Sequence, residues 1–272
     1  MTSTGRYSSD IRALPGDIPS LLKIVRGQLV HGDHLDIYGY NNEDFRSSSR
    51  QTLPLENRLA EIFRICDEPL MVARPVTDRQ IGTCRDYALM LCGMLRENFI
   101  LARVRCGFAA YFSANRFDDH WICEYWQETA NKWIRVDPQL DDQKCRHFDI
   151  SFDTANLPDG AFLTAKEAWR LCYEHGAASE QFGHGEATGA WFLWVNLARD
   201  SLALKGLETS PWDTWRSVIG QETIISSADR LACDAIARAI EDLEQQRVPN
   251  DAPLDLVPFW MLDMSAASGN PK

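Results

Sequence analysis

The sequence predicts an α+β fold, in which a helix packs on an antiparallel sheet and a mainly helical region follows. Three observations support this prediction. An apolar pattern with helical spacing follows Cys84, three segments of strand composition lie between residues 101 and 137, and helical patterns dominate from residue 164 onward. We therefore expect a core over residues 10–150 and a helical C-terminal region over residues 151–272 that packs on it.

Two helices are expected in the N-terminal part of the core. Residues 1–9 are polar and are expected to form a loose tail. The segment 17–30 has an apolar face, and Asp17 can cap its start. The segment 55–66 shows the same alternation of apolar and charged positions. A polar, serine-rich loop is expected between them.

A cysteine marks the start of the next predicted helix. Gly82 and Thr83 lead directly into Cys84, and the apolar pattern behind it continues to about Arg96. The unpaired N–H groups and the dipole at a helix N-terminus favour negative charge, and the thiolate is the reactive form of cysteine. Buried structural thiols are also common. This stretch alone therefore does not choose between a nucleophile and a buried thiol.

Three strands are expected after this helix, over residues 101–112, 120–126 and 132–137. We interpret the second and third as a tight hairpin whose turn is centred between Glu128 and Thr129. That register places His120 opposite Asp137, within hydrogen-bonding reach. A slip of one residue would separate the pair, so the inference depends on the register.

The C-terminal half is expected to be largely helical. Residues 141–160 are irregular and acidic, and helical patterns follow. Thr164 and Glu167 form a capping-box pattern at the start of the first of them. The helical segments are expected over residues 164–177, 189–205, 211–219 and 227–246.

Composition limits the function classes and the location. The chain has 272 residues, with 28 basic against 39 acidic residues and a net charge of −11, so a nucleic-acid partner is not expected. No apolar run approaches the ~18 residues that a membrane helix needs, so no membrane partner is expected either. Residues 1–9 lack the pattern of a signal peptide, and we expect a cytoplasmic protein with eight reduced cysteines.

The predicted placement of Cys84, His120 and Asp137 suits thiol acyl chemistry. The histidine takes the thiol proton and later protonates the leaving amine, while the aspartate orients the imidazole. The backbone N–H of Cys84 can help to hold the oxyanion. A cysteine, a histidine and an aspartate in this order, with the last two on neighbouring strands, fit a papain-like α+β architecture.

Three blocks of sequence resemble the transglutaminase-like superfamily. They are the stretch from Gly82 to Ala88 with Leu95-Arg96 and Ala102-Arg103-Val104-x-x-Gly107, then residues 120–124, then residues 133–138. The family's histidine strand usually reads His-x-Trp-x-Glu, and here the tryptophan stands one place early. The resemblance covers about residues 55–140 and implies a Cys84, His120 and Asp137 triad acting through a thioester. Residues 189–215 also resemble the C-terminal part of bacterial transglutaminase-domain proteins of unassigned activity.

Other residues have both a functional and a structural interpretation. Family members often use a side chain upstream of the cysteine as second oxyanion donor, and Gln80 is a candidate by proximity, as are Tyr38 and Tyr40. Trp121 could wall the substrate cleft or belong to the hairpin core. Asp86 could orient the substrate, or it could simply complement the helix dipole.

The function expected from these features is acyl transfer or hydrolysis at an amide or ester carbonyl. The substrate is a peptide, a protein or a small amide or ester, and the acceptor is water or an amine. No metal or organic cofactor is expected, because Cys145 and His147 lack a second pair of ligands at zinc-site spacing. A rival interpretation is a catalytically silent module that keeps the fold for binding or as a scaffold. The sequence makes no prediction of oligomeric state.

Overall fold

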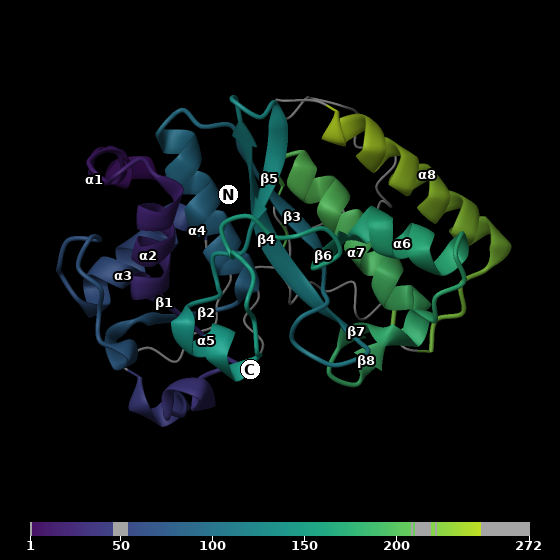
Figure 1. Cartoon of the computed structure of the whole chain (residues 1–272), viewed down its shortest axis with the longest axis horizontal. Helices are drawn as coiled ribbons and strands as arrows, with labels where there is room; N and C mark the ends of the chain where they lie inside the picture. The colour runs from purple at the N-terminus through teal and green to yellow at the C-terminus, as the bar shows by residue number, and fades with distance from the viewer. Residues whose placement is uncertain (1, 46–53, 208, 210–218, 221, 246–272) are drawn as a thin grey trace. The chain divides into compact units, whose positions relative to one another are not determined.

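The computed structural model describes residues 2–45, 54–207, 209, 219–220 and 222–245 (Figure 1). Helices and a mixed sheet alternate along the chain, which confirms the predicted α+β class. The described residues form two compact units, one within residues 2–104 and 121–159 and one within residues 105–120 and 160–245. The predicted division into a core and a C-terminal region after residue 150 stays a prediction.

The first unit contains five α-helices among its described residues. Three of them were expected from the sequence, over residues 17–30, 55–66 and from Cys84 to about Arg96, and their observed bounds agree with the expected ones. They are α1 (Ser8–Arg12), α2 (Ile18–Gln28), α3 (Leu55–Ile65), α4 (Cys84–Glu97) and α5 (Asp142–His147). Asp17 caps α2 as predicted, since its Oδ1 accepts the N–H of Ser20 at 2.9 Å. Helix α4 packs against α1, α2 and α3, and its residues from Arg85 to Leu95 are buried.

The expected loose tail is wrong, because the N-terminus is docked on the end of α4. Thr4 is buried and donates through Oγ1 to Oε2 of Glu97 at 2.6 Å. The hydroxyl of Ser8 donates to the other oxygen of the same carboxylate. These hydrogen bonds and the buried Ile11 hold the segment in place.

Short strands missed by the sequence patterns precede α4. Strand β1 (Leu29–His31) pairs in parallel with β2 (Gln80–Gly82), and Leu29 stands beside Gln80 in the register. This pairing sets the position of the backbone that leads into Cys84. Three residues per strand are too few to show a periodic pattern, and the 48 residues 32–79 lie between the two strands in the chain.

The larger sheet has six strands in the described residues. Its order is β6-β3-β4-β7-β8, with β5 paired to β4. The three expected strands are confirmed as β3 (Ala102–Ala109), β4 (Phe117–Gln127) and β5 (Lys132–Val136). The other strands are β6 (Phe162–Thr164), β7 (Phe182–His184) and β8 (Ala187–Thr188).

The second unit is mainly helical, as expected. Its helices are α6 (Ala165–Tyr173), α7 (Ala190–Leu204) and α8 (Ser227–Glu244), and the expected helix over 211–219 lies almost wholly outside the described residues. Thr164 and Glu167 form the predicted capping box of α6. Helix α7 is buried on all sides, including its polar residues, and Trp191 and Trp194 lie in the hydrophobic core of this unit.

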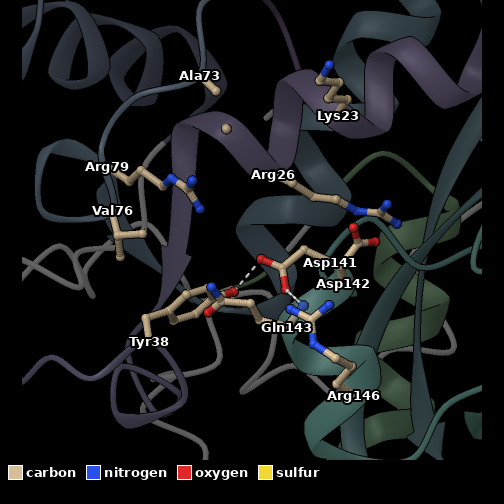
Figure 2. A pocket seen from close by; sticks show the side chains of 11 residues that line it. Lys23, Arg26, Tyr38, Ala73, Val76, Arg79, Asp141, Asp142, Gln143 and Arg146 are labelled. Atoms are coloured by element: carbon tan, nitrogen blue, oxygen red, sulfur yellow. Dashed lines mark hydrogen bonds between the residues drawn. The ribbon is translucent and has the colours of Figure 1, made fainter.

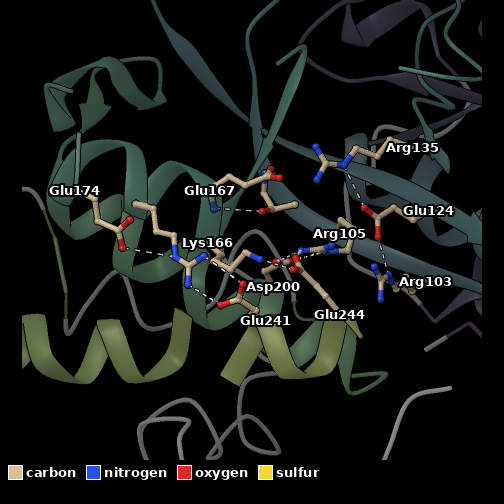
Figure 3. Close-up of polar contacts among 12 residues, drawn as sticks. Arg103, Arg105, Glu124, Arg135, Lys166, Glu167, Glu174, Asp200, Glu241 and Glu244 are labelled. Carbon is tan, nitrogen blue, oxygen red and sulfur yellow. Dashed lines mark hydrogen bonds and ion pairs between the residues drawn. The ribbon is translucent and has the colours of Figure 1, made fainter. Parts of the chain in front are cut away.

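Buried charges tie the helices of the second unit together (Figure 3). The guanidinium of Arg105 binds both carboxylate oxygens of Asp200, at 2.9 and 2.7 Å, and Glu244 on α8 at 2.7 Å. Lys166 on α6 binds the second oxygen of Glu244. The network therefore links β3, α6, α7 and α8, and its charges are neutralised within the unit.

Among the described residues, no helix has the length and apolar character needed to cross a membrane.

Candidate active site

Cys84 is the first residue of α4, and its side chain is half-buried while its neighbours are buried. Thr83 before it has an extended backbone, with φ −119° and ψ 172°, so the helix begins at the cysteine. The thiol therefore lies at the positive end of a helix and is accessible. Cys66 offers a contrast within the same unit, because it is also half-buried but follows the C-terminus of α3.

Asp86 holds the start of α4 in place. Its Oδ2 accepts the backbone N–H of Thr83 at 2.8 Å and the Thr83 hydroxyl at 3.2 Å. Its Oδ1 binds Nη2 of Arg58 on α3 at 2.7 Å, and both side chains are nearly inaccessible, at 2% and 4% exposure. The carboxylate is therefore occupied by partners that fix the helix end, which supports the structural interpretation of Asp86.

Gly82 is required by the close approach of this carboxylate. A Cβ atom at Gly82 would lie 3.0 Å from Oδ2 and 3.1 Å from Cβ of Asp86. The glycine two places before the cysteine thus leaves the space in which Asp86 reaches Thr83. The packing of Asp86 therefore explains the glycine of this motif independently of any chemistry of Cys84.

Gln80 is buried on β2. Its exposure is 2%, and its Oε1 has no hydrogen-bond partner among the described residues. A buried acceptor without a partner is costly, and the same amide group carries two N–H donors. Of the other candidate donors, Tyr38 is committed, since its hydroxyl donates to Asp141, and Tyr40 is exposed.

Asp137 follows β5 and is fully buried. Its Oδ1 accepts the backbone N–H of Gln139 at 2.8 Å, and its own N–H donates to the Thr154 carbonyl at 2.9 Å. Arg26 on α2 donates to the Asp137 carbonyl at 3.2 Å and to the Pro138 carbonyl at 3.3 Å. The backbone around the carboxylate is therefore held from several sides.

The predicted hairpin register is wrong by two residues. Cys123 pairs with Val136 and Glu124 pairs with Arg135, so the same register places Asp137 opposite Ile122 rather than opposite His120. The cause is the turn, which takes four residues after Gln127. Its last residue, Asn131, has φ +49°, a conformation of turns that asparagine tolerates.

His120 lies on β4 with 1% exposure, among aromatic rings of the second unit. Its ring centroid is 5.0 Å from that of Phe112, 6.0 Å from Tyr111 and 6.5 Å from Phe162, all in edge contacts. Tyr111 and Phe112 come from the loop after β3, and Phe162 comes from β6. The rings restrict the orientation of the imidazole.

Trp121 is fully buried, and its position on β4 sends it to the face opposite to His120. Its indole N–H has no hydrogen-bond partner among the described residues. Burial supports the hairpin-core interpretation. Trp133 lies on the strand beside it, with the guanidinium carbon of Arg103 3.9 Å from its ring centroid.

Sequence reasoning missed the residues that support Asp137. Gln139 is buried, and its link to the Asp137 carboxylate is an Asx turn, for which the Asp137-Pro138 pair was the available signal. Arg26 has no such signal, since 111 positions separate it from Asp137.

Among the described residues, no group of three or more His, Cys, Asp or Glu side chains is close enough to hold a metal ion.

A family model described as the transglutaminase-like superfamily matches residues 67–138. The matched segment begins before β2 and ends just after β5, so it contains Gln80, Cys84, His120 and Asp137. It covers well under half of the chain and leaves out α6, α7 and α8. No curated protein and no solved structure matches the chain.

Proposed function

We propose that the protein transfers or hydrolyses acyl groups through a thioester on Cys84, because residues 67–138 match the model of the transglutaminase-like superfamily. The observation that carries this proposal is the placement of Cys84, an accessible thiol at the first position of a buried helix within the matched segment. Nucleophilic thiol chemistry needs access to the substrate and a site that favours the thiolate. The substrate is a peptide, a protein or a small amide or ester.

The first step forms the acyl-enzyme. His120 removes the thiol proton of Cys84, and the sulfur attacks the carbonyl carbon of the substrate. The oxyanion of the tetrahedral intermediate accepts hydrogen bonds from the Cys84 backbone N–H and from the side-chain amide of Gln80. The role of Gln80 is supported by its burial on β2, two strand residues before the turn into Cys84, and by its Oε1, which no described residue holds in a hydrogen bond.

The intermediate then collapses to the thioester. His120 gives its proton to the leaving amine or alcohol, and the bond between the carbonyl carbon and that leaving group breaks. Asp137 orients the imidazole and stabilises its protonated form. A fixed orienting carboxylate is supported by the hydrogen bonds that hold the Asp137 backbone to Thr154 and Arg26.

The second step releases the acyl group. Water gives a free acid, as in an amidase or peptidase, and a primary amine gives a new amide, as in a transglutaminase-type reaction. In each case His120 takes a proton from the incoming nucleophile and the thiol is regenerated. We propose a reducing compartment, the cytoplasm, because all eight cysteines are unbridged in the structure.

Mass spectrometry of the intact protein tests this proposal. The protein is incubated with a library of peptide amides and thioesters, with and without a primary amine. We expect an acyl adduct on Cys84 that disappears in Cys84→Ala, and we expect the amine to shorten its lifetime if the acceptor is an amine. His120→Ala should slow adduct formation about 10²–10⁴-fold, because proton transfer is lost.

The matched control is Cys66→Ala, which removes a half-buried thiol at the opposite end of a helix in the same unit. This variant should form the adduct like the unchanged protein. If no library member acylates Cys84, or if Cys66 is acylated equally, the enzyme proposal is wrong. The chain is then better described as a binding or scaffold module that keeps the fold without the chemistry.

A further inference from the structure

A cavity of about 530 Å³ lies within the first unit (Figure 2). Its lining comes from α2, from the segment 73–79 and from α5. The cavity is large enough for a small organic molecule, since ligand sites in proteins commonly have volumes of about 300–1,000 Å³. None of its lining residues belongs to the proposed triad.

The lining is cationic in a chain that is acidic overall. Four cationic side chains and two carboxylates line the cavity, whereas the whole chain carries a net charge of −11. The charged lining residues are Lys23, Arg26, Arg79, Arg146, Asp141 and Asp142. A local excess of positive charge in such a chain favours an anionic ligand.

Arg26 is held in position by neutral acceptors. Its Nε donates to the Pro138 carbonyl at 3.3 Å, and its Nη2 donates to the Asp137 carbonyl at 3.2 Å and to Thr154 Oγ1 at 2.8 Å. Among the described residues, its Nη1 has no hydrogen-bond partner and no carboxylate lies within 4.0 Å of the group. The guanidinium is therefore fixed through one edge and keeps a donor for another molecule.

Arg79 repeats this arrangement from another side of the cavity. Its Nε donates to the Arg74 carbonyl at 3.0 Å, and in the described part of the chain its two terminal nitrogens have no hydrogen-bond acceptor. Figure 2 shows its side chain extending from the segment 73–79 toward the middle of the cavity. Both side chains are half-buried, and neither Arg26 nor Arg79 forms an ion pair with a described residue.

The carboxylates of the lining do not neutralise these groups directly. Asp141 is used as the N-cap of α5, because its Oδ1 accepts the N–H groups of Gln143 and Lys144 at 3.1 and 3.0 Å, and its Oδ2 accepts the Tyr38 hydroxyl. Asp142 is exposed to solvent, where its charge is screened. Asp137, Asp141 and Asp142 attract the charge of Arg26 only from beyond ion-pair distance, so the two guanidinium groups can still bind an anion directly.

We propose that this cavity binds a small organic anion whose carboxylate or phosphate groups accept hydrogen bonds from Arg26 and Arg79. Guanidinium groups suit such anions because their planar donors match two oxygens at once. The exposed Lys23 and Arg146 add positive potential around the same cavity. The site is separate from Cys84, so the proposal holds whether or not the chain is an acyltransferase.

Titration calorimetry with the full chain tests the site. The probes are inorganic phosphate, inorganic pyrophosphate and citrate, each at neutral pH and with potassium chloride added to keep the ionic strength constant. We expect saturable binding of at least one probe, and the preference between pyrophosphate and citrate tells whether the natural ligand carries phosphate or carboxylate groups. Arg79→Gln should weaken that binding about 10- to 100-fold, because a charge-assisted pair of hydrogen bonds is lost.

The matched control is Arg64→Gln, which removes an exposed guanidinium of α3 in the same unit and should leave binding unchanged. If Arg79→Gln does not fold, phenylglyoxal labelling of the unchanged protein replaces it. The binding probe should then protect Arg79 from modification and should not protect Arg64. The proposal is overturned if none of the three probes binds saturably. It is also overturned if Arg79→Gln and Arg64→Gln bind the probe equally well, or if the probe protects Arg79 and Arg64 equally from modification.

Discussion

The start of α4 and the cavity beside α5 both gather charged side chains in the first unit, but they use them differently. At α4, Arg58 and Asp86 are nearly inaccessible and lie 2.7 Å apart. In the cavity, Arg26 and Arg79 bind neutral carbonyl oxygens, and no described carboxylate lies within 4.0 Å of them. Paired charges fix the fold, whereas charges that keep free donors can bind a ligand.

Lys144 lies between these two cases. Its amine is buried and donates to the Gln139 carbonyl at 3.2 Å, with the rings of Tyr87 and Tyr38 nearby. Burial lowers the pKa of Lys144 to about 8, although the carboxylates of Asp141 and Asp137 oppose this shift. The charge is desolvated without a direct ion pair, so the protonation of this lysine affects stability.

The largest expected effect on stability comes from breaking the buried ion pair between Arg58 and Asp86. Asp86→Asn should lower the free energy of unfolding of the first unit by about 3–5 kcal/mol, because a charge on Arg58 stays buried after its carboxylate is lost. Hydrogen exchange of the α4 amides in denaturant measures the change. Glu61→Gln breaks an exposed pair with Arg64 on α3 and should produce no measurable change. Equal losses of unfolding free energy for the two substitutions would mean that the buried ion pair at α4 stabilises the fold no more than an exposed pair does.

An intermediate effect is expected at Lys144 and depends on pH. The pKa of this lysine is about 8 in the folded chain, against an ordinary value of 10.5, so between these values the unfolded chain binds more protons. Stability should therefore rise with pH in that window, by up to roughly 1.4 kcal/mol per pH unit, and this slope should be absent below about pH 8. The measurement compares unfolding free energies of the unchanged protein and of Lys144→Met. Parallel curves for the two proteins would show that Lys144 is not the titrating group.

The smallest effect on stability is expected in the open cavity. Arg79→Gln removes a side chain with one hydrogen bond, from Nε to the Arg74 carbonyl, and should cost about 1 kcal/mol or less. The same hydrogen-exchange measurement provides the comparison with Asp86→Asn. A loss as large as that of Asp86→Asn would mean that Arg79 stabilises the fold and is not held ready for a ligand.

The sequence allowed good prediction where local chemistry decides the structure. Asp17 and Thr164 cap helices because their side chains reach backbone N–H groups three residues away, and this needs no knowledge of the rest of the fold. The start of α4 at Cys84 was predicted from the apolar pattern that begins directly behind Gly82 and Thr83. The reason for Gly107 emerged only from the structure, since a Cβ atom there would lie 2.1 Å from the Leu163 carbonyl oxygen of the neighbouring strand.

Prediction failed where a single residue, or a partner far away in the sequence, determines the local structure. The hairpin register depended on the turn, and the left-handed Asn131 lengthened it beyond the expected turn. Helix α5 has six residues, too few for a periodic pattern, and its start depends on the Asp141 cap. The cavity was also invisible in the sequence, because Arg26, Arg79 and Arg146 come together only through tertiary contacts.

The most direct test of the central proposal is the pH dependence of the reaction of Cys84 with iodoacetamide. Cys66 serves as the internal reference, because it is also half-buried but lies at a helix C-terminus. We expect Cys84 to react much faster than Cys66 near neutral pH, and we expect this advantage to disappear in His120→Ala. Equal rates for the two thiols, or an advantage of Cys84 that persists in His120→Ala, would contradict activation of Cys84 by His120.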